Sequence, residues 1–138
     1  MTEKKLAEML MMAIEDEIHD REHYKRLIHK VSDRDDKEIL RQISLDEQKH
    51  ERIFTDIYTK VTGKKPHVTN KKEHEPSDNI LSDFEKSIFD ETEAVEFYRQ
   101  IYFSFLDLET RDMLYEVITD EQNHAVKLTY LYSKYRKF

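Results

Sequence analysis

The sequence predicts an all-α protein, a four-helix bundle in which two antiparallel helical hairpins are joined by a long crossover loop. Two observations indicate this fold. The chain contains an internal repeat of 74 residues, and its one glycine and both prolines lie between the two copies. Long stretches without glycine or proline favour helices over strands and turns. We expect a single domain over residues 1–138, with hairpins at about 2–62 and 79–136 and the crossover loop at about 63–78.

The repeat is clearest in two tetrapeptides, EQKH at 47–50 and EQNH at 121–124, which stand 74 residues apart. Glu17 and Glu91 have the same separation. A duplication of this length indicates two stacked supersecondary units, neither of which can bury its apolar face alone. Further pairs in the same register are Ile14 with Ile88, Asp16 with Asp90, Tyr24 with Tyr98, Leu40 with Leu114 and Asp46 with Asp120.

Apolar residues at a period of 3.6 predict both helices of the first hairpin. The first helix is expected from Thr2 to about Val31; Ser32 or Asp33 then caps a second helix that stops at Gly63. The very short connection makes these helices antiparallel. Their inward residues include Leu6, Leu10, Ile14, Glu17, Tyr24 and Leu27, then Leu40, Ile43, Glu47, His50, Phe54 and Ile57.

The second hairpin is predicted in the same way. Its first helix starts near Ser77–Asn79, and Asp107 caps the last helix. The crossover loop can span roughly 56 Å at about 3.3 Å per residue, which exceeds a helix of about 45 Å. We therefore expect the second and third helices to be parallel. The inward residues include Ile80, Phe84, Ile88, Glu91, Tyr98 and Ile101, then Leu114, Val117, Glu121, His124, Leu128 and Leu131.

A metal site is expected halfway along the bundle. In each hairpin the two glutamates are equally distant from the turn, so their carboxylates lie at one height. Positions i and i+3 share a helix face, so each Glu-x-x-His pair projects inward together. The predicted ligands are Glu17, Glu47, His50, Glu91, Glu121 and His124.

The charge of this set predicts two divalent ions. Four buried glutamates carry −4, which is costly unless it is neutralised, and two divalent cations supply +4. A mixed oxygen and nitrogen ligand set suits iron, with manganese or zinc as possible substitutes, better than magnesium.

Composition excludes several other classes. Cysteine is absent, which rules out disulfides, thiolate zinc sites and cysteine-ligated iron sites within these residues and fits a reducing cytoplasm. A net charge of −7 without a basic stripe argues against nucleic-acid binding, and no apolar run is long enough to cross a membrane. The basic clusters Lys64–Lys65 and Lys71–Lys72 are expected to be solvated parts of the crossover loop.

With these ligands, the chain resembles the rubrerythrin branch of the ferritin-like di-iron proteins over nearly its whole length. The spacing from Glu91 to Tyr98, and from Glu17 to Tyr24, is similar to the glutamate-to-tyrosine spacing of that family. The resemblance implies that Glu47 and Glu121 bridge the two metals and that Glu17 and Glu91 are terminal ligands. It also implies that His50 and His124 each bind one ion.

The chain departs from the family pattern at two points. Rubrerythrins carry another glutamate three residues after the third-helix ligand, where this sequence has Ala94, so the family's exchange of that ligand on redox change is in doubt. Asp20 could supply a carboxylate from the opposite side, although an outer hydrogen-bonding role is the preferred interpretation. The rubredoxin domain of full-length rubrerythrins is also lacking, so we expect electrons from an external donor, such as a rubredoxin-like protein.

Several polar and aromatic residues lie outside the predicted ligand set. Tyr24 and Tyr98, the candidate catalytic residues, either hydrogen-bond the ligands or only pack in the core. We expect His19, His23, His67 and His74 to be solvated, with a surface metal site as the alternative for the i, i+4 pair His19 and His23. The aromatic residues Phe89, Phe97, Phe103, Tyr130 and Tyr135 exceed what the inner faces can bury, which predicts a homodimer.

The expected function is that of a cytoplasmic di-iron peroxidase, an oxidoreductase that reduces H2O2 or O2. Two alternatives remain at this stage. One is a ferroxidase or iron-handling protein, which for storage would need a particle of many subunits. The other is a non-catalytic bundle that binds a partner and uses metal only for stability.

Overall fold

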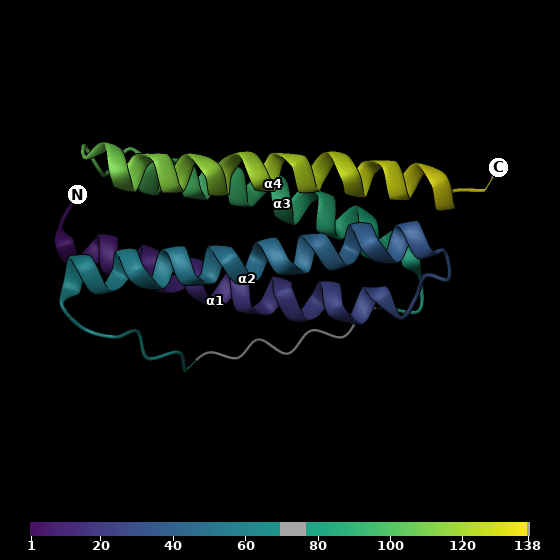
Figure 1. The fold of residues 1–138 in the computed structure, drawn as a ribbon, viewed down its shortest axis with the longest axis horizontal. Helices are drawn as coiled ribbons and strands as arrows, with labels where there is room; N and C mark the ends of the chain where they lie inside the picture. The colour runs from purple at the N-terminus through teal and green to yellow at the C-terminus, as the bar shows by residue number, and fades with distance from the viewer. Residues whose placement is uncertain (70–76, 138) are drawn as a thin grey trace.

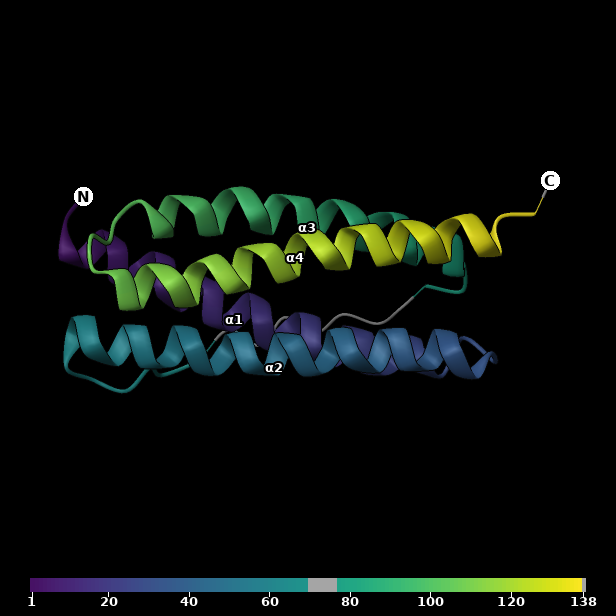
Figure 2. The ribbon, with the colours of Figure 1, turned by 45° about the horizontal axis from the view of Figure 1, so that its top comes forward.

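The computed structural model describes residues 1–69 and 77–137, and within these ranges every regular element is an α-helix. The helices pair as two hairpins that lie side by side, α1 with α2 and α3 with α4 (Figures 1 and 2). The predicted all-α four-helix bundle is confirmed. The helices are α1 (Glu3–Ile28), α2 (Arg34–Thr62), α3 (Ile80–Tyr102) and α4 (Leu108–Tyr135).

Each helix begins at a side-chain cap. Thr2, Asp33, Asn79 and Asp107 all have extended backbones, and their side-chain oxygens accept from backbone N–H groups of the first turn. This satisfies donors that have no partner inside the helix. The helix α2 ends at Gly63, whose φ of 72° lies in the left-handed region that glycine enters at no steric cost. The expected end of the first helix, near Val31, was too late, because α1 stops at Ile28.

The crossover connects opposite ends of the bundle. The helix α2 ends at the same end of the molecule as the N-terminus, and α3 begins at the opposite end (Figure 1). The helices α2 and α3 are therefore parallel, as expected. Residues 70–76, which include Lys71, Lys72 and His74, lie outside the described part of the chain, so the expectation of solvation is not tested for them.

The core consists of two apolar clusters separated by a polar layer. The six predicted ligands belong to neither cluster and lie between them. The fold thus encloses the polar layer between apolar packing above and below. One cluster contains Leu10, Ile14, Phe54, Ile57, Tyr98, Ile101, Leu114 and Val117, and the other contains Tyr24, Leu27, Leu40, Ile43, Phe84, Leu128 and Leu131.

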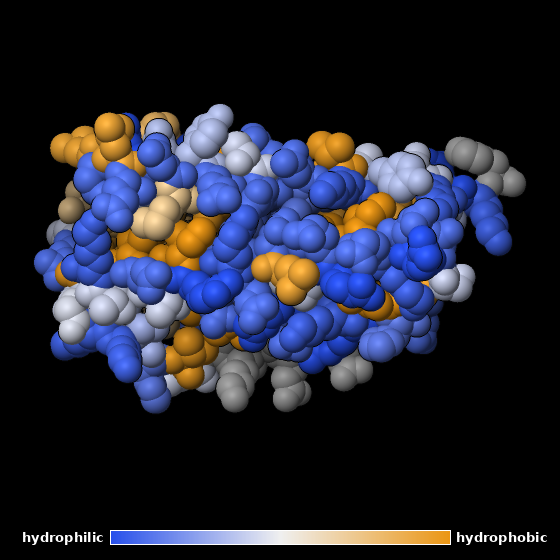
Figure 3. Space-filling model, in the orientation of Figure 1, coloured by the Kyte–Doolittle hydropathy of each residue, from blue (hydrophilic) through white to orange (hydrophobic). Residues whose placement is uncertain are grey.

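The face of the molecule shown in Figure 3 is mainly hydrophilic, with several apolar spots. Of the aromatic residues expected to exceed the core, Phe89, Phe103 and Tyr130 are exposed. Phe97 and Tyr135 instead pack partly buried against the two core clusters. None of the helices in the described segments is long and apolar enough to cross a membrane.

Candidate metal centre

The fold brings all six predicted ligands together in the polar layer. They form two groups of four, in each of which one possible ligand atom per residue lies within 4.8 Å of the others. Glu47 and Glu121 belong to both groups. All six side chains are at most 1% exposed. The groups are Glu17, Glu47, His50 and Glu121, and Glu47, Glu91, Glu121 and His124.

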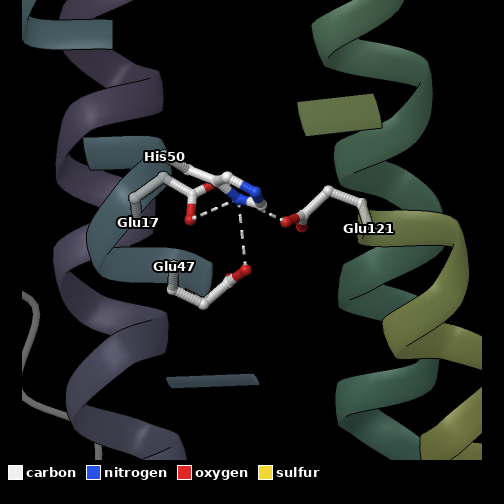
Figure 4. A group of neighbouring side chains, drawn as sticks. All are labelled: Glu17, Glu47, His50 and Glu121. Atoms are coloured by element: carbon white, nitrogen blue, oxygen red, sulfur yellow. Dashed lines mark ion pairs between the residues drawn. The ribbon is translucent and has the colours of Figure 1, made fainter. Parts of the chain in front are cut away.

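In the first group the carboxylates surround one nitrogen of His50 (Figure 4). Its Nδ1 lies 2.9 Å from Glu121 Oε1, 3.4 Å from Glu47 Oε1 and 3.5 Å from Glu17 Oε2. The residues come from three helices, α1, α2 and α4, so the group exists only when the two hairpins are docked.

The second group repeats this arrangement around His124. Its Nδ1 lies 3.2 Å from Glu47 Oε1, 3.5 Å from Glu91 Oε2 and 3.7 Å from Glu121 Oε1. The imidazole rings of His50 and His124 face each other with centroids 6.1 Å apart. The two groups therefore share one centre with approximate twofold symmetry.

Each histidine is oriented by an aspartate from the other hairpin. His50 Nε2 donates to Asp120 Oδ2 at 2.8 Å, and His124 Nε2 donates to Asp46 Oδ2 at 2.8 Å. Burial raises the pKa of the Asp120 carboxyl, but His50 and Lys49 outweigh it and lower that pKa to about 2. An ionised aspartate fixes the proton on Nε2 and turns Nδ1 towards the centre, as is usual for metal-binding histidines.

The two tyrosines also reach across the hairpins. Tyr98 Oη donates to Glu17 Oε1 at 2.6 Å, and Tyr24 Oη donates to Glu91 Oε1 at 2.7 Å. Burial and the neighbouring glutamates raise the pKa of both phenols well above 10, so both remain donors. Both tyrosines therefore hydrogen-bond a predicted ligand, which is one of the two roles expected for them. Each bonds the glutamate of the other repeat, not the glutamate on its own helix.

The protons that the centre holds are those that a metal would displace. Burial lowers the pKa of both histidines, but their hydrogen bonds to Asp120 and Asp46 and the negative charge of the central glutamates raise it to about 11 for His50 and about 12 for His124. Burial and the Glu47 charge raise the pKa of Glu17 and Glu121 well above the usual value.

The donor set fits two cations. Eight buried atoms in the layer make no hydrogen bond, and all belong to the six predicted ligands: Glu17 Oε2, Glu91 Oε2, both oxygens of Glu47 and of Glu121, and Nδ1 of His50 and His124. Buried polar atoms are almost always hydrogen-bonded, so this many in one place needs an explanation. Ligand atoms for metal ions supply one, because a cation takes the place of the missing donors.

The prediction of solvation is wrong for His23. Its side chain is buried, and Nε2 lies 2.9 Å from Ser87 Oγ on α3. The Ser87 hydroxyl donates to the Asp83 carbonyl at 2.8 Å, so it accepts from His23. His19 is partly exposed and stacks on His23, with ring centroids 6.5 Å apart. A wider inward face on the first helix would have included position 23, which is four residues before the buried Leu27.

Asp20 belongs to neither group of four, and its carboxylate instead lies 3.2 Å from His19 Nδ1. A pocket of about 660 Å³ opens between α1 and α3 at this point, lined by Asp20, Ala94 and Tyr98 among others. Burial and the charges of Glu47, Glu91 and Glu17 raise the pKa of Asp20 well above its usual value. Tyr98 lines the pocket and donates a hydrogen bond to Glu17, so this side chain links the pocket to a predicted ligand. No pattern in the sequence predicted this opening.

Comparison with known proteins agrees with this architecture. The rubrerythrin family model matches residues 8–132. The uncharacterized protein YhjR of Bacillus subtilis is 30% identical over 121 residues, covering 88% of this chain and 82% of YhjR.

Two solved structures share the fold. A hypothetical protein from Pyrococcus furiosus has a TM-score of 0.82 at 24% identity, over 96% of this chain and 93% of its own. The bacterioferritin of Desulfovibrio desulfuricans, whose structure describes its diiron site, has a TM-score of 0.80 at 20% identity, over 95% and 80%.

Proposed function

The chain belongs to the rubrerythrin family, and we propose that it is a di-iron oxidoreductase that reduces hydrogen peroxide, or O2, with electrons from a separate carrier. The observation that supports this proposal most is the pair of buried four-residue groups that share two glutamates. Two ions held by common carboxylates can act together on one small oxidant.

We assign the ligand roles from the sharing pattern. Glu47 and Glu121, which belong to both groups, would bridge the ions, and Glu17 and Glu91 would each bind one. His50 and His124 would each complete one group through Nδ1. The similar bacterioferritin fold, described with a diiron site, supports iron as the metal; manganese and zinc remain possible substitutes.

The iron pair would supply two electrons to the oxidant, and the protein would provide position and dryness. Asp120 and Asp46 hold the two imidazoles in one orientation through Nε2. The hydrogen bond from Tyr98 Oη keeps a proton beside Glu17 Oε1 and fixes that carboxylate. The apolar clusters on both sides exclude water, and the α1/α3 pocket has room for a molecule as small as peroxide. In this scheme Tyr24 and Tyr98 are the residues next to the reacting centre.

The remaining partners follow from composition and surface. These 138 residues contain no cysteine, so we propose that electrons come from another protein, such as a rubredoxin-like carrier. We place the protein in the cytoplasm, where a cysteine-free chain meets no redox constraint. The exposed Phe89, Phe103 and Tyr130 support a homodimer as the proposed assembly.

Stopped-flow mixing of the anaerobic Fe(II) protein with H2O2 tests the function. We expect rapid oxidation of two irons per chain, and loss of that phase in the double variant Glu47→Ala/Glu121→Ala. The matched control is Glu38→Ala, an exposed glutamate on α2, which should react as the wild type does. Equal rates in all three proteins would reject the proposal.

Reaction with O2 and gel filtration separate the peroxidase from the iron-handling alternative. A peroxidase should oxidise its irons faster with peroxide than with O2 and should elute as a small oligomer. An iron-storage role instead requires turnover of added Fe(II) with O2 and a large hollow particle. Metal-dependent stability without either reaction would identify a non-catalytic bundle.

A further inference from the structure

The aspartate that orients His50 is also held by a cation. The oxygen of Asp120 that accepts from His50 Nε2, Oδ2, lies 2.9 Å from Lys49 Nζ. Lys49 belongs to α2 and reaches across to α4, where it also lies 3.3 Å from Glu116. His50 Nδ1, which faces the centre, is therefore linked to the Lys49 ammonium through its own imidazole ring and the Asp120 carboxylate.

Among the described residues, no lysine or arginine is paired with the equivalent aspartate of the other half. Asp46, which orients His124, accepts at its second oxygen from the neutral amide of Gln42 at 3.0 Å. The repeat places Asn123 where Lys49 stands, and Gln42 where Glu116 stands. The side chains of Asp46 and Asp120 are nearly equally exposed, 18% and 20%. Water therefore screens the two aspartates to a similar degree, and the difference in charge between their neighbours, Gln42 and Lys49, remains.

The two outer shells have the same total charge but a different arrangement. Asp120, Lys49 and Glu116 sum to −1, and Asp46 with its neutral neighbours also carries −1. Lys49 lies on the oxygen that the histidine uses, whereas Glu116 lies one step further out and is 56% exposed. Water screens an exposed charge strongly, so the nearer ammonium dominates the field at His50.

A carboxylate bonded to the outer nitrogen of an imidazole increases the basicity of its metal-binding nitrogen. An ammonium on that carboxylate withdraws part of this effect and repels a nearby dication. We infer that Lys49 makes the two metal positions unequal, so that a divalent ion fills the His124 group before the His50 group. This inference rests on the proposed two-metal centre and adds an order of filling to it.

Calorimetric titration of the metal-free protein with Co²⁺, in two single-site backgrounds, tests the order. His124→Ala leaves the His50 group intact, and His50→Ala leaves the His124 group intact. We expect the first background to bind its single Co²⁺ about tenfold more weakly than the second. Equal affinities, or the reverse order, would overturn the inference.

Neutralising the ammonium in both backgrounds tests its cause. Lys49→Gln keeps a hydrogen-bond donor and removes the charge, so it should tighten Co²⁺ binding about tenfold with His124→Ala and less than twofold with His50→Ala. The reciprocal change Asn123→Lys should weaken binding only with His50→Ala. An equal effect of Lys49→Gln in both backgrounds would refute a local action of Lys49.

Lys60→Gln is the matched control, since it removes an exposed ammonium from the same helix about 16 Å away, at 1.5 Å per residue. It should change neither affinity. Circular dichroism of each variant, with and without Co²⁺, shows that the helices remain formed. Because the readout is binding, two unequal Co²⁺ sites in a protein that does not react with peroxide would contradict the proposed function and support the inference.

Discussion

In the central layer the two hairpins carry the same residues at equivalent positions, whereas one helical turn away they differ. Glu17, Glu47 and His50 correspond to Glu91, Glu121 and His124, and the tyrosine and aspartate that orient them are also repeated. On the edge where α1 meets α3, however, Asp20 corresponds to Ala94 and His23 to Phe97. The pocket opens at this unequal edge.

The difference shows which positions the chemistry constrains. Two ions that share Glu47 and Glu121 require like donors on both sides, and each donor must be oriented from the opposite hairpin. Residues outside this set can differ between the two repeats, and they give the two halves of the centre different environments. In the proposed two-metal centre, the symmetric layer would hold the two ions, and the pocket at the unequal edge would give access from one side.

Loss of a shared glutamate should break the symmetry most severely. In Glu47→Ala both groups of four lose a ligand, so we expect fewer than one Co²⁺ bound per chain. Glu17→Ala affects one group only and should leave about one Co²⁺. Occupancy at 100 times Kd stabilises a protein by about 2.7 kcal/mol per site, so melting with excess metal should rank the variants in the same order. Equal stoichiometry in both would contradict the assignment of Glu47 as shared.

A rise in pH should change the contributions of His50 and His124 in the same direction. It should lower the stability of the metal-free protein and raise the affinity for Co²⁺. His50 and His124 have pKa values of about 11 and 12 in the folded, metal-free protein, against about 6.5 unfolded. Their stabilisation is complete below pH 6.5 and is lost as the pH rises towards 11. Between pH 7 and 8 the metal-free protein should therefore lose about 1 kcal/mol per histidine.

Metal binding should show the reverse trend, because the ligands must lose these protons first. Co²⁺ affinity should rise about tenfold per pH unit for each proton displaced. Thermal unfolding at pH 7 and 8, with EDTA or with Co²⁺, compares the two trends. Parallel slopes in both conditions would show that the histidines hold no displaceable protons.

Prediction from sequence worked where the repeat and the helical period determined the answer. The meeting of the six candidate ligands in one layer follows from spacing, because equal distances from two turns put the residues at one height. The helix caps follow from Thr, Asp and Asn at the helix starts. The helical period did not predict the burial of His23, because the buried face of α1 is wider on the side that meets α3 than the predicted apolar stripe. Nor did it reveal the pairing of Lys49 with Asp120, because a contact between helices depends on their docking.

The two tyrosines give a more sensitive test of symmetry. Tyr98→Phe and Tyr24→Phe each remove a hydrogen bond to a buried glutamate and nothing else. We expect each to cost about 1–3 kcal/mol of unfolding free energy in the metal-free protein, and the two losses to agree within about 0.5 kcal/mol. Urea unfolding of both variants measures this. Tyr102→Phe, on the partly buried end of α3, is the control and should be near neutral.

At the unequal edge, where the halves have different partners, the effects should be confined to stability and should leave metal binding unchanged. His23→Ala should lower the free energy of unfolding by about 1–3 kcal/mol, because it leaves the buried Ser87 hydroxyl without its donor. His19→Ala, at a partly exposed position one turn earlier in α1, should lower it by less than about 0.5 kcal/mol. Since neither residue is among the six candidate ligands, Co²⁺ stoichiometry should remain two in both variants. If His23→Ala lowered the stoichiometry, the edge would belong to the metal centre, and the separation of a symmetric layer from an unequal edge would fail.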